Sequence, residues 1–180
     1  MLIKALALGL ALSGCSCSSL PVVSMQAAQQ FLEYPGGSCS GAAVGPHLLL
    51  TAEHCQTEGG TLQTVNGRTV HVLKTGRDGR DHVLLTVDIP FSHWLRIDPR
   101  PLVVGEHLRY IGHPGGMPVP VLREVTVGAV TADRAYLQTD GWLGDSGSAL
   151  VDDSGAVVGV VSAITYEGPF ALMVAYRMEL

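Results

Sequence analysis

The chain has 180 residues, of which 47% are hydrophobic and 15% charged, and this balance excludes a disordered chain. Its formal charge of −5 argues against nucleic acid as a partner. The 22 glycines and 10 prolines are many for a helical bundle and favour short strands joined by turns. The length fits one domain behind an export segment, or two half-domains that share one site.

The first 14 residues have the pattern of a secretory signal. Lys4 precedes an apolar run over residues 5–12, and the small residues Ser13 and Gly14 follow it. The run is shorter than the ~20 apolar residues that a membrane-spanning helix needs. We therefore predict that residues 1–14 direct export, with an N-terminal core strand or helix as the alternative.

Residues 12–15 read Leu-Ser-Gly-Cys and resemble the bacterial lipobox, in which the cysteine becomes the lipidated first residue of the mature protein. The resemblance implies a lipid anchor on Cys15. The protein would then lie in the bacterial cell envelope, facing the periplasm or the outside, with simple secretion as the alternative. Residues 16–30 are rich in Ser, Ala and Gln without clear periodicity, so residues 15–32 are predicted to form a tether. Cys17 has no assigned role.

The remainder of the chain alternates between short apolar runs and turn residues, and no stretch has sustained helical periodicity. Asn66-Gly67 lies between two such runs and is a strong hairpin signal. Three prolines within residues 89–101 indicate a connector between halves. The pattern predicts an all-β barrel or sandwich over residues 33–180, with halves at about 33–90 and 102–180. The expected strands are 42–44, 48–50, 61–65, 69–73, 82–87, 108–111, 119–130, 135–139, 148–151, 157–164 and 170–176.

A serine lies between glycines in the segment Gly144-Asp145-Ser146-Gly147, just before the apolar run 149–151. Flanking glycines let the backbone turn sharply and approach a substrate closely. Acyl transfer by serine needs an attacking hydroxyl, a base, an acid that orients the base, and donors for the oxyanion. Ser146 is the candidate nucleophile, and the N–H groups of Gly144 and Ser146 are candidate oxyanion donors. An ordinary hairpin turn is the alternative.

A base and an orienting acid have candidates earlier in the chain. His54 follows the apolar run 48–50, and its neutral imidazole is well populated at pH 7. The other six histidines lack such a context, and no His and Cys set has convincing zinc spacing. Asp81 precedes the apolar run 83–85 and is the candidate acid, with strand capping as the alternative. Asp78 is a weaker candidate, because it lies in a turn.

Cys39 and Cys55 bracket the strand pair that delivers His54. A disulfide between them is expected in an exported protein. Closing a loop of roughly 15 residues would contribute about 3 kcal/mol of stability. Two free buried thiols are the alternative.

These segments together resemble the chymotrypsin/trypsin-like serine protease family. Residues 38–42 and 50–55 resemble its histidine block, residues 81–85 its aspartate block, and residues 144–148 its Gly-Asp-Ser-Gly-Gly block, in the family's order. The resemblance covers about residues 38–176. It implies two antiparallel six-stranded β-barrels with the active site between them. It also implies the triad His54, Asp81 and Ser146, an oxyanion hole at Gly144 and Ser146, and the disulfide of Cys39 with Cys55.

Some positions depart from the family pattern. Glu53 stands where the family has Ala, and would either raise the pKa of His54 or face solvent. In animal members a newly cut N-terminal amine pairs with the Asp before the nucleophile, and Asp145 has no evident partner of that kind before residue 38. Residues 110–115 resemble a Gly-x-Pro-x-Gly turn of the compact bacterial branch, which is where the chain would belong.

The primary specificity pocket is expected at Asp140, Ile164 and Phe170. Asp140 lies six residues before Ser146, where the trypsin pattern carries the acid that selects Arg or Lys. Ile164 and Phe170 fall where open pockets have small residues, so their bulk would shrink the pocket. The sequence therefore leaves the side-chain preference open.

The resemblance implies a serine endopeptidase that hydrolyses peptide bonds through an acyl-enzyme intermediate. The alternative is a catalytically inactive trypsin-fold binding module anchored in the bacterial envelope, because Asp145 lacks an evident partner. Neither a cofactor nor a metal is expected. The expected partners are a protein or peptide substrate and, through Cys15, the membrane.

Overall fold

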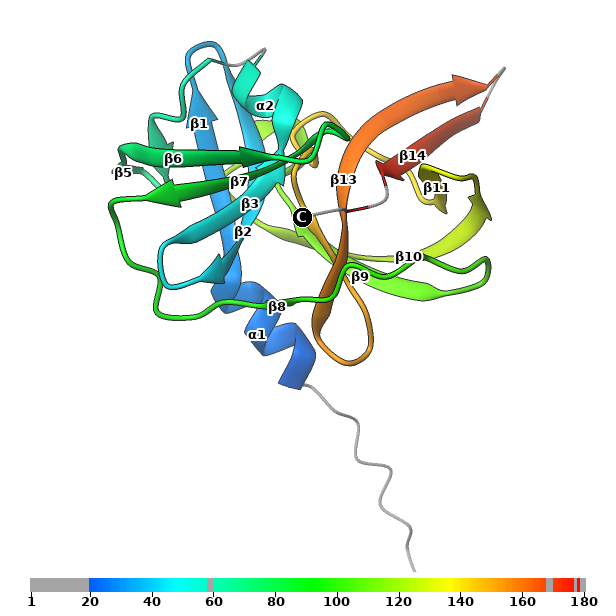
Figure 1. Cartoon of the computed structure of the whole chain (residues 1–180). Helices are drawn as coiled ribbons and strands as arrows, with labels where there is room; N and C mark the ends of the chain where they lie inside the picture. Colours follow the sequence, from blue (N-terminus) through cyan, green and yellow to red (C-terminus); the bar gives the residue numbers. More distant parts are fainter. Residues whose placement is uncertain (1–19, 58–59, 168–169, 177, 179–180) are drawn as a thin grey trace, which may run out of the picture.

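The computed structural model of the chain describes residues 20–57, 60–167, 170–176 and 178. Almost all of its regular structure is β, arranged as two halves that lie side by side, with one short helix below them (Figure 1). The prediction of an all-β fold with two barrel-like halves is confirmed. Within these residues no helix is long and apolar enough to cross a membrane.

The N-terminal half is a curled seven-stranded sheet in the order β5-β4-β1-β2-β3-β7-β6, with every neighbouring pair antiparallel. Leucines such as Leu49, Leu50 and Leu85 are fully buried within it. The pairings between described residues leave β5 and β6 at open edges, so this half is barrel-like without closing. Its strands are β1 (Gln29–Tyr34), β2 (Gly37–Gly45), β3 (Leu48–Ala52), β4 (Thr64–Val65), β5 (Arg68–Thr69), β6 (Val72–Arg77) and β7 (His82–Val87).

The C-terminal half is a closed six-stranded barrel. In the order β12-β9-β10-β11-β14-β13 each strand pairs with the next. The barrel closes because β12, the first strand of this order, also pairs with β13, the last. Tyr110, Leu137 and Met173 are fully buried inside it. Its strands are β9 (His107–Gly112), β10 (Val121–Val130), β11 (Arg134–Gln138), β12 (Ala149–Val151), β13 (Ala156–Glu167) and β14 (Phe170–Tyr176), and the 3-10 turn η1 (Pro114–Gly116) follows β9.

The segment between the halves contains one short strand, β8 (Arg96–Ile97), which runs parallel to β13. Just before it, the N–H of Leu95 donates to the carbonyl of Ala43 in β2 at 3.0 Å. The connector is therefore bonded to both halves and crosses the seam between them. This seam is where the candidate site lies.

The hairpin predicted at Asn66-Gly67 is confirmed. Both residues have positive φ, 49° and 72°, as the favoured two-residue hairpin turn requires. The strands on either side, β4 and β5, are only two residues long and therefore shorter than predicted.

The tether predicted for residues 15–32 is wrong from Leu20 onward. Residues Leu20–Ala28 form the helix α1, which contacts β2 and β9, and β1 begins directly after it. Met25, Ala28 and Leu32 are buried in the core. The apolar residues of α1 cluster without helical periodicity, so local sequence gave no helix signal, and contact with both halves orders the segment instead. The predicted signal at residues 1–14 and the lipid-bearing Cys15 lie outside the described residues.

Candidate active site

Two neighbouring strands of the N-terminal half deliver His54 and Asp81. Ala52 at the end of β3 pairs with His82 at the start of β7, so the residues just beyond them meet. His54 lies in the short helix α2 (Glu53–Thr57), and its backbone N–H donates to Oδ1 of Asp81 at 2.8 Å. Its ring Nδ1 lies 2.9 Å from Oδ2 and 3.1 Å from Oδ1 of the same carboxylate. The carboxylate therefore fixes both the backbone and the ring of His54.

Asp81 adopts an uncommon backbone conformation, with φ of 66°. A non-glycine residue in the left-handed region is strained, and such strain is held in place by its surroundings at functional sites. Here the carbonyl of Asp81 accepts the N–H of Glu53 at 2.9 Å while its side chain accepts from His54. The weaker candidate, Asp78, is buried and instead contacts Nδ1 of His82 at 2.6 Å. The structure brings Asp81 to His54 and Asp78 to His82.

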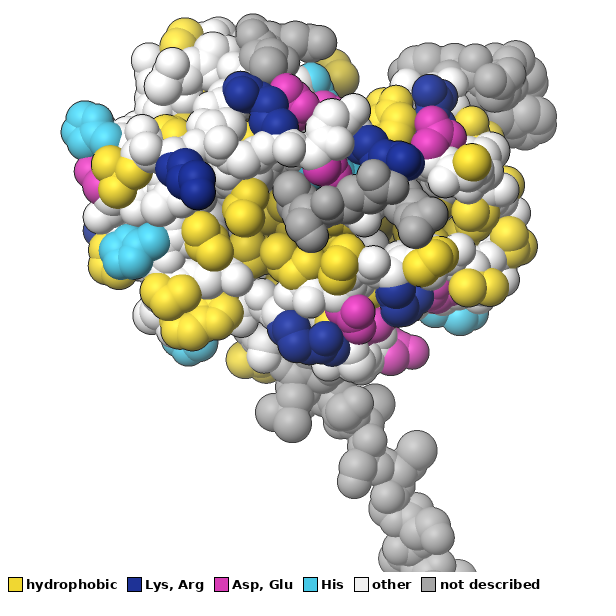
Figure 2. All heavy atoms as spheres, viewed as in Figure 1, with side chains coloured by type: hydrophobic (Ala, Val, Ile, Leu, Met, Phe, Trp, Pro, Cys, Tyr) yellow, Lys and Arg dark blue, Asp and Glu magenta, His cyan; other side chains and the backbone are white. Residues whose placement is uncertain are grey.

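Glu53 pairs with a cation on the neighbouring strand. Its Oε1 lies 2.8 Å from Nε of Arg77 in β6. Across the face in Figure 2, basic and acidic side chains lie next to one another and form no broad patch of one sign. The Glu53 side chain is 24% exposed, so it does not face open solvent, and Arg77 is a charged partner for it.

The loop that carries Ser146 requires glycine at two positions. Gly144 has φ of 97°, and a Cβ on it would lie 2.2 Å from the carbonyl oxygen of His113. Gly147 has φ of 86°, and a Cβ there would lie 2.1 Å from the carbonyl oxygen of Ser40. Both contacts are far below van der Waals distance. The two glycines thus let the loop pack against the backbone around Ser146.

The N–H groups on this loop divide into bonded and available ones. The N–H of Asp145 donates to the carbonyl of Trp142 at 3.1 Å, and that of Gly147 to Val161 at 2.7 Å. The backbone N–H groups of Gly144 and Ser146 have no backbone acceptor among the described residues. These are the two groups predicted as oxyanion donors, and they remain available for a ligand.

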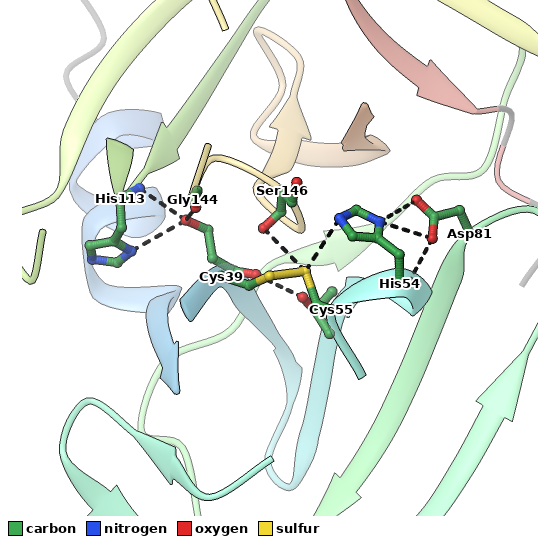
Figure 3. Close-up of a disulfide and its surroundings, with 9 residues drawn as sticks. Cys39, His54, Cys55, Asp81, His113, Gly144 and Ser146 are labelled. Carbon is green, nitrogen blue, oxygen red and sulfur yellow. Dashed lines mark hydrogen bonds and ion pairs between the residues drawn. A yellow bond between two sulfur atoms is a disulfide. The ribbon is translucent and has the colours of Figure 1, made fainter. Parts of the chain in front are cut away.

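His54 lies between Asp81 and Ser146 in Figure 3, with Nδ1 directed at the carboxylate. Within the described part of the chain, no hydrogen bond joins the Ser146 hydroxyl to Nε2 of His54. Nε2 lies 3.8 Å from Sγ of Cys55, and that sulfur lies 3.9 Å from the carbonyl oxygen of Ser146. Catalytic hydrogen bonds are often long before substrate binds, so this arrangement is compatible with a triad.

Asp145, which the sequence left without a partner, has three. The buried carboxylate accepts hydrogen bonds at Oδ2 from the Tyr110 hydroxyl at 3.1 Å and the Trp142 N–H at 3.3 Å. Nε of Arg123 lies 3.6 Å from the same oxygen. Burial raises the pKa of Asp145 above its ordinary value, and Arg123 and Tyr110 partly offset that effect. Asp145 thus has an internal cation where the animal enzymes supply an amine.

The disulfide of Cys39 with Cys55 is confirmed, with an S–S distance of 2.02 Å. It lies directly beneath His54 and Ser146 (Figure 3). The two sulfurs and His54 have potential ligand atoms within 4.8 Å of one another, as a metal site would. Because both sulfurs form the disulfide, they are not thiolates and do not offer metal ligands.

Of the three residues predicted to form the specificity pocket, the structure describes the side chains of Asp140 and Ile164. Asp140 is exposed and lies two residues after the end of β11. Ile164 is half-buried, and a Cβ on Gly141 would lie 3.0 Å from its Cγ1 and 2.9 Å from Cε of Met173. The space beside Gly141 is therefore filled by apolar side chains. The side chain of Phe170 lies outside the described part of the structure.

Sequence reasoning missed four residues around the site: Ser40, Tyr110, His113 and Arg123. Tyr110 and Arg123 are direct partners across the antiparallel pair β9–β10, and this register alone brings both to Asp145. Ser40 belonged to a recognised block but carried no chemical signal of its own. The role of His113 depends on contacts between the two halves, which local context does not reveal.

Comparison with known proteins agrees with this architecture. A family model described as a trypsin-like peptidase domain matches residues 39–160. No curated protein matches the chain significantly.

Three solved structures illustrate the likeness. A Glu endopeptidase is 20% identical, with a TM-score of 0.70 over 83% of this chain and 84% of that one. A protease from M. tuberculosis in its active form is 17% identical, with a TM-score of 0.70 over 87% and 79%. A serine endoprotease from Yersinia pestis is 21% identical, with a TM-score of 0.72 over 87% and 61%. At these identities the likeness shows the fold alone.

Proposed function

Because the chain belongs to the trypsin-like peptidase family, we propose that it is a serine endopeptidase that works through an acyl-enzyme intermediate. The observation that carries this proposal is the contact of Asp81 with both the backbone and the ring of His54. A carboxylate on Nδ1 leaves Nε2 as the basic nitrogen on the side of Ser146. The fold itself implies that the substrates are proteins or peptides.

In the proposed reaction the Ser146 hydroxyl attacks the scissile carbonyl carbon, and Nε2 of His54 takes its proton. Asp81 holds the productive tautomer and stabilises the imidazolium that forms. The carbonyl oxygen becomes an oxyanion that accepts hydrogen bonds from the N–H groups of Gly144 and Ser146. The imidazolium then protonates the leaving amine as the C–N bond breaks. A water molecule repeats these steps on the acyl-enzyme and releases the acid.

The inactive binding module was the alternative because Asp145 had no evident partner. Arg123 and Tyr110 contact Asp145 and act as its partners. These contacts favour a Ser146 loop that is held in place without a newly cut N-terminal amine. All three proposed triad residues are also present. We therefore favour an active enzyme.

A fluorophosphonate probe tests the proposal, because it labels only a serine that a neighbouring base activates. The full-length chain should be labelled, and Ser146→Ala and His54→Ala should not. Ser154→Ala is the matched control, since Ser154 lies exposed in a turn and should not affect labelling. A folded parent that resists the probe would contradict the proposal and favour the binding module.

We further propose that the protein is anchored in the bacterial envelope by lipid on Cys15. The support is the position of Cys15 after a short apolar run. In bacteria fed a labelled fatty acid, the parent should incorporate label and Cys15→Ser should not, with Cys17→Ser as control. Equal labelling of the parent and Cys15→Ser would rule out this anchor.

A further inference from the structure

Ser40 is a fully buried polar residue at the seam between the two halves. It lies on β2 in the N-terminal sheet, next to the disulfide residue Cys39. Its backbone N–H and its hydroxyl both donate across the seam, to the loop that carries Ser146. A buried hydroxyl is costly to leave without partners, so the contacts it makes constrain what surrounds it.

The two donations reach carbonyl groups on either side of Asp145. The N–H of Ser40 donates to the carbonyl of Ser146 at 2.8 Å, and its Oγ donates to the carbonyl of Gly144 at 2.8 Å. The N–H groups of Gly144 and Ser146 have no such backbone partner among the residues described. The Gly144 carbonyl shares its peptide group with the N–H of Asp145, and the Ser146 carbonyl shares its peptide group with the N–H of Gly147. Anchoring both carbonyls fixes the backbone directly after the Gly144 N–H and on either side of the peptide group that carries the Ser146 N–H. The two N–H groups are thereby kept available for an oxyanion.

The direction of the Ser40 hydroxyl bond follows from its other partner. Oγ accepts the backbone N–H of His113 at 2.9 Å, so its single proton is available for the carbonyl of Gly144. The ring Nδ1 of His113 lies 3.3 Å from Oγ. The carbonyl of His113 packs against Gly144, where a Cβ would meet it at 2.2 Å. His113 thus supports the same loop from its other side.

We propose that Ser40 is a positioning residue that holds the oxyanion loop in its working conformation by anchoring the carbonyls of Gly144 and Ser146. This inference rests on the proposed function, because an oxyanion loop matters only if Ser146 reacts. Ser40 does not touch the substrate in this scheme. It acts through the orientation of the two N–H donors, so its loss should affect the reaction step more than binding.

The test compares Ser40→Ala with Thr51→Val in the full-length chain. Thr51 is also fully buried, and its hydroxyl donates to the carbonyl of Ser40 at 2.7 Å without bonding to the Gly144 carbonyl. The fluorophosphonate probe gives a maximal labelling rate and a half-saturating concentration for each variant. Ser40→Ala should lower the maximal rate about tenfold to hundredfold and leave the half-saturating concentration unchanged. Thr51→Val should retain most of the parent rate.

Amide hydrogen exchange of residues 142–147 provides a readout that does not need activity. Ser40→Ala should speed exchange there, and Thr51→Val should not. If the parent is labelled but Ser40→Ala labels equally fast, the inference is overturned and the proposed function stands. If no protein is labelled, the proposed function fails, and exchange alone then decides for or against the anchoring role. Failure of Ser40→Ala to fold while Thr51→Val folds would overturn it in favour of a purely structural role.

Discussion

His113 should make the stability of this protein depend on pH. The side chain is 2% exposed, and burial lowers its pKa from 6.5 to about 4. At a pH between these two pKa values, the unfolded chain therefore carries a proton on His113, whereas the folded chain does not. Stability conferred by the neutral ring is complete above the ordinary pKa and is lost as the pH falls below it.

The size of this effect follows from the displacement of the pKa. Each pH unit between the two pKa values costs the folded state about 1.4 kcal/mol. At pH 5, well inside the window, His113 alone should reduce the free energy of unfolding by about 2 kcal/mol relative to pH 8. Below the folded-state pKa the reduction should level off at about 3 kcal/mol.

Urea unfolding at pH 8 and pH 5 measures this contribution when the parent is compared with His113→Asn. Other groups titrate in both proteins, so the difference between their pH dependences isolates His113. The variant should be less stable at pH 8 yet lose about 2 kcal/mol less on acidification. His71→Asn, at an exposed position, controls for loss of a histidine as such. If His113→Asn and the parent lose equal stability between the two pH values, the argument from burial is refuted.

Three further predictions concern the site. Arg123→Gln removes the cation beside Asp145, so the pKa of that carboxylate should rise further. The free energy of unfolding should fall by about 2 kcal/mol. The acid side of the pH profile of the labelling rate should move to higher pH. Replacing Cys39 and Cys55 by Ala should cost about 3 kcal/mol in thermal or urea unfolding, and no loss would contradict the loop-closure argument. Asp81→Asn should fold normally yet slow labelling by roughly 10⁴-fold, and a decrease below tenfold would contradict its orienting role.

The parts that sequence could predict are those with local signals. Alternating apolar runs and turn residues identified the β fold, and Asn66-Gly67 identified its hairpin. His54, Asp81 and Ser146 could be proposed as the triad because each lies near an apolar run that becomes a strand, and a strand end fixes where its neighbours point. Such features belong to segments of a few residues. They can therefore be recognised in the sequence before the fold is known.

The parts that sequence missed depend on contacts between distant segments. The helix α1 has no amphipathic pattern of its own, and packing against both halves orders it. The pairing of Arg123 with Tyr110, and so the partner of Asp145, depends on one register out of several that the same strands allow. The role of Ser40 depends on contacts between the two halves, so its local sequence does not indicate it. A method that reads local pattern cannot place these residues.

The early start of the folded domain sets how far an anchored enzyme could reach. If the proposed lipid is attached to Cys15, five residue steps along the chain would separate it from Leu20, where α1 begins. Five residue steps span at most ~17 Å, at about 3.4 Å per residue. The proposed protease would then act only in a thin layer at the bilayer surface, and a substrate in the surrounding fluid would have to diffuse to that layer to be cut.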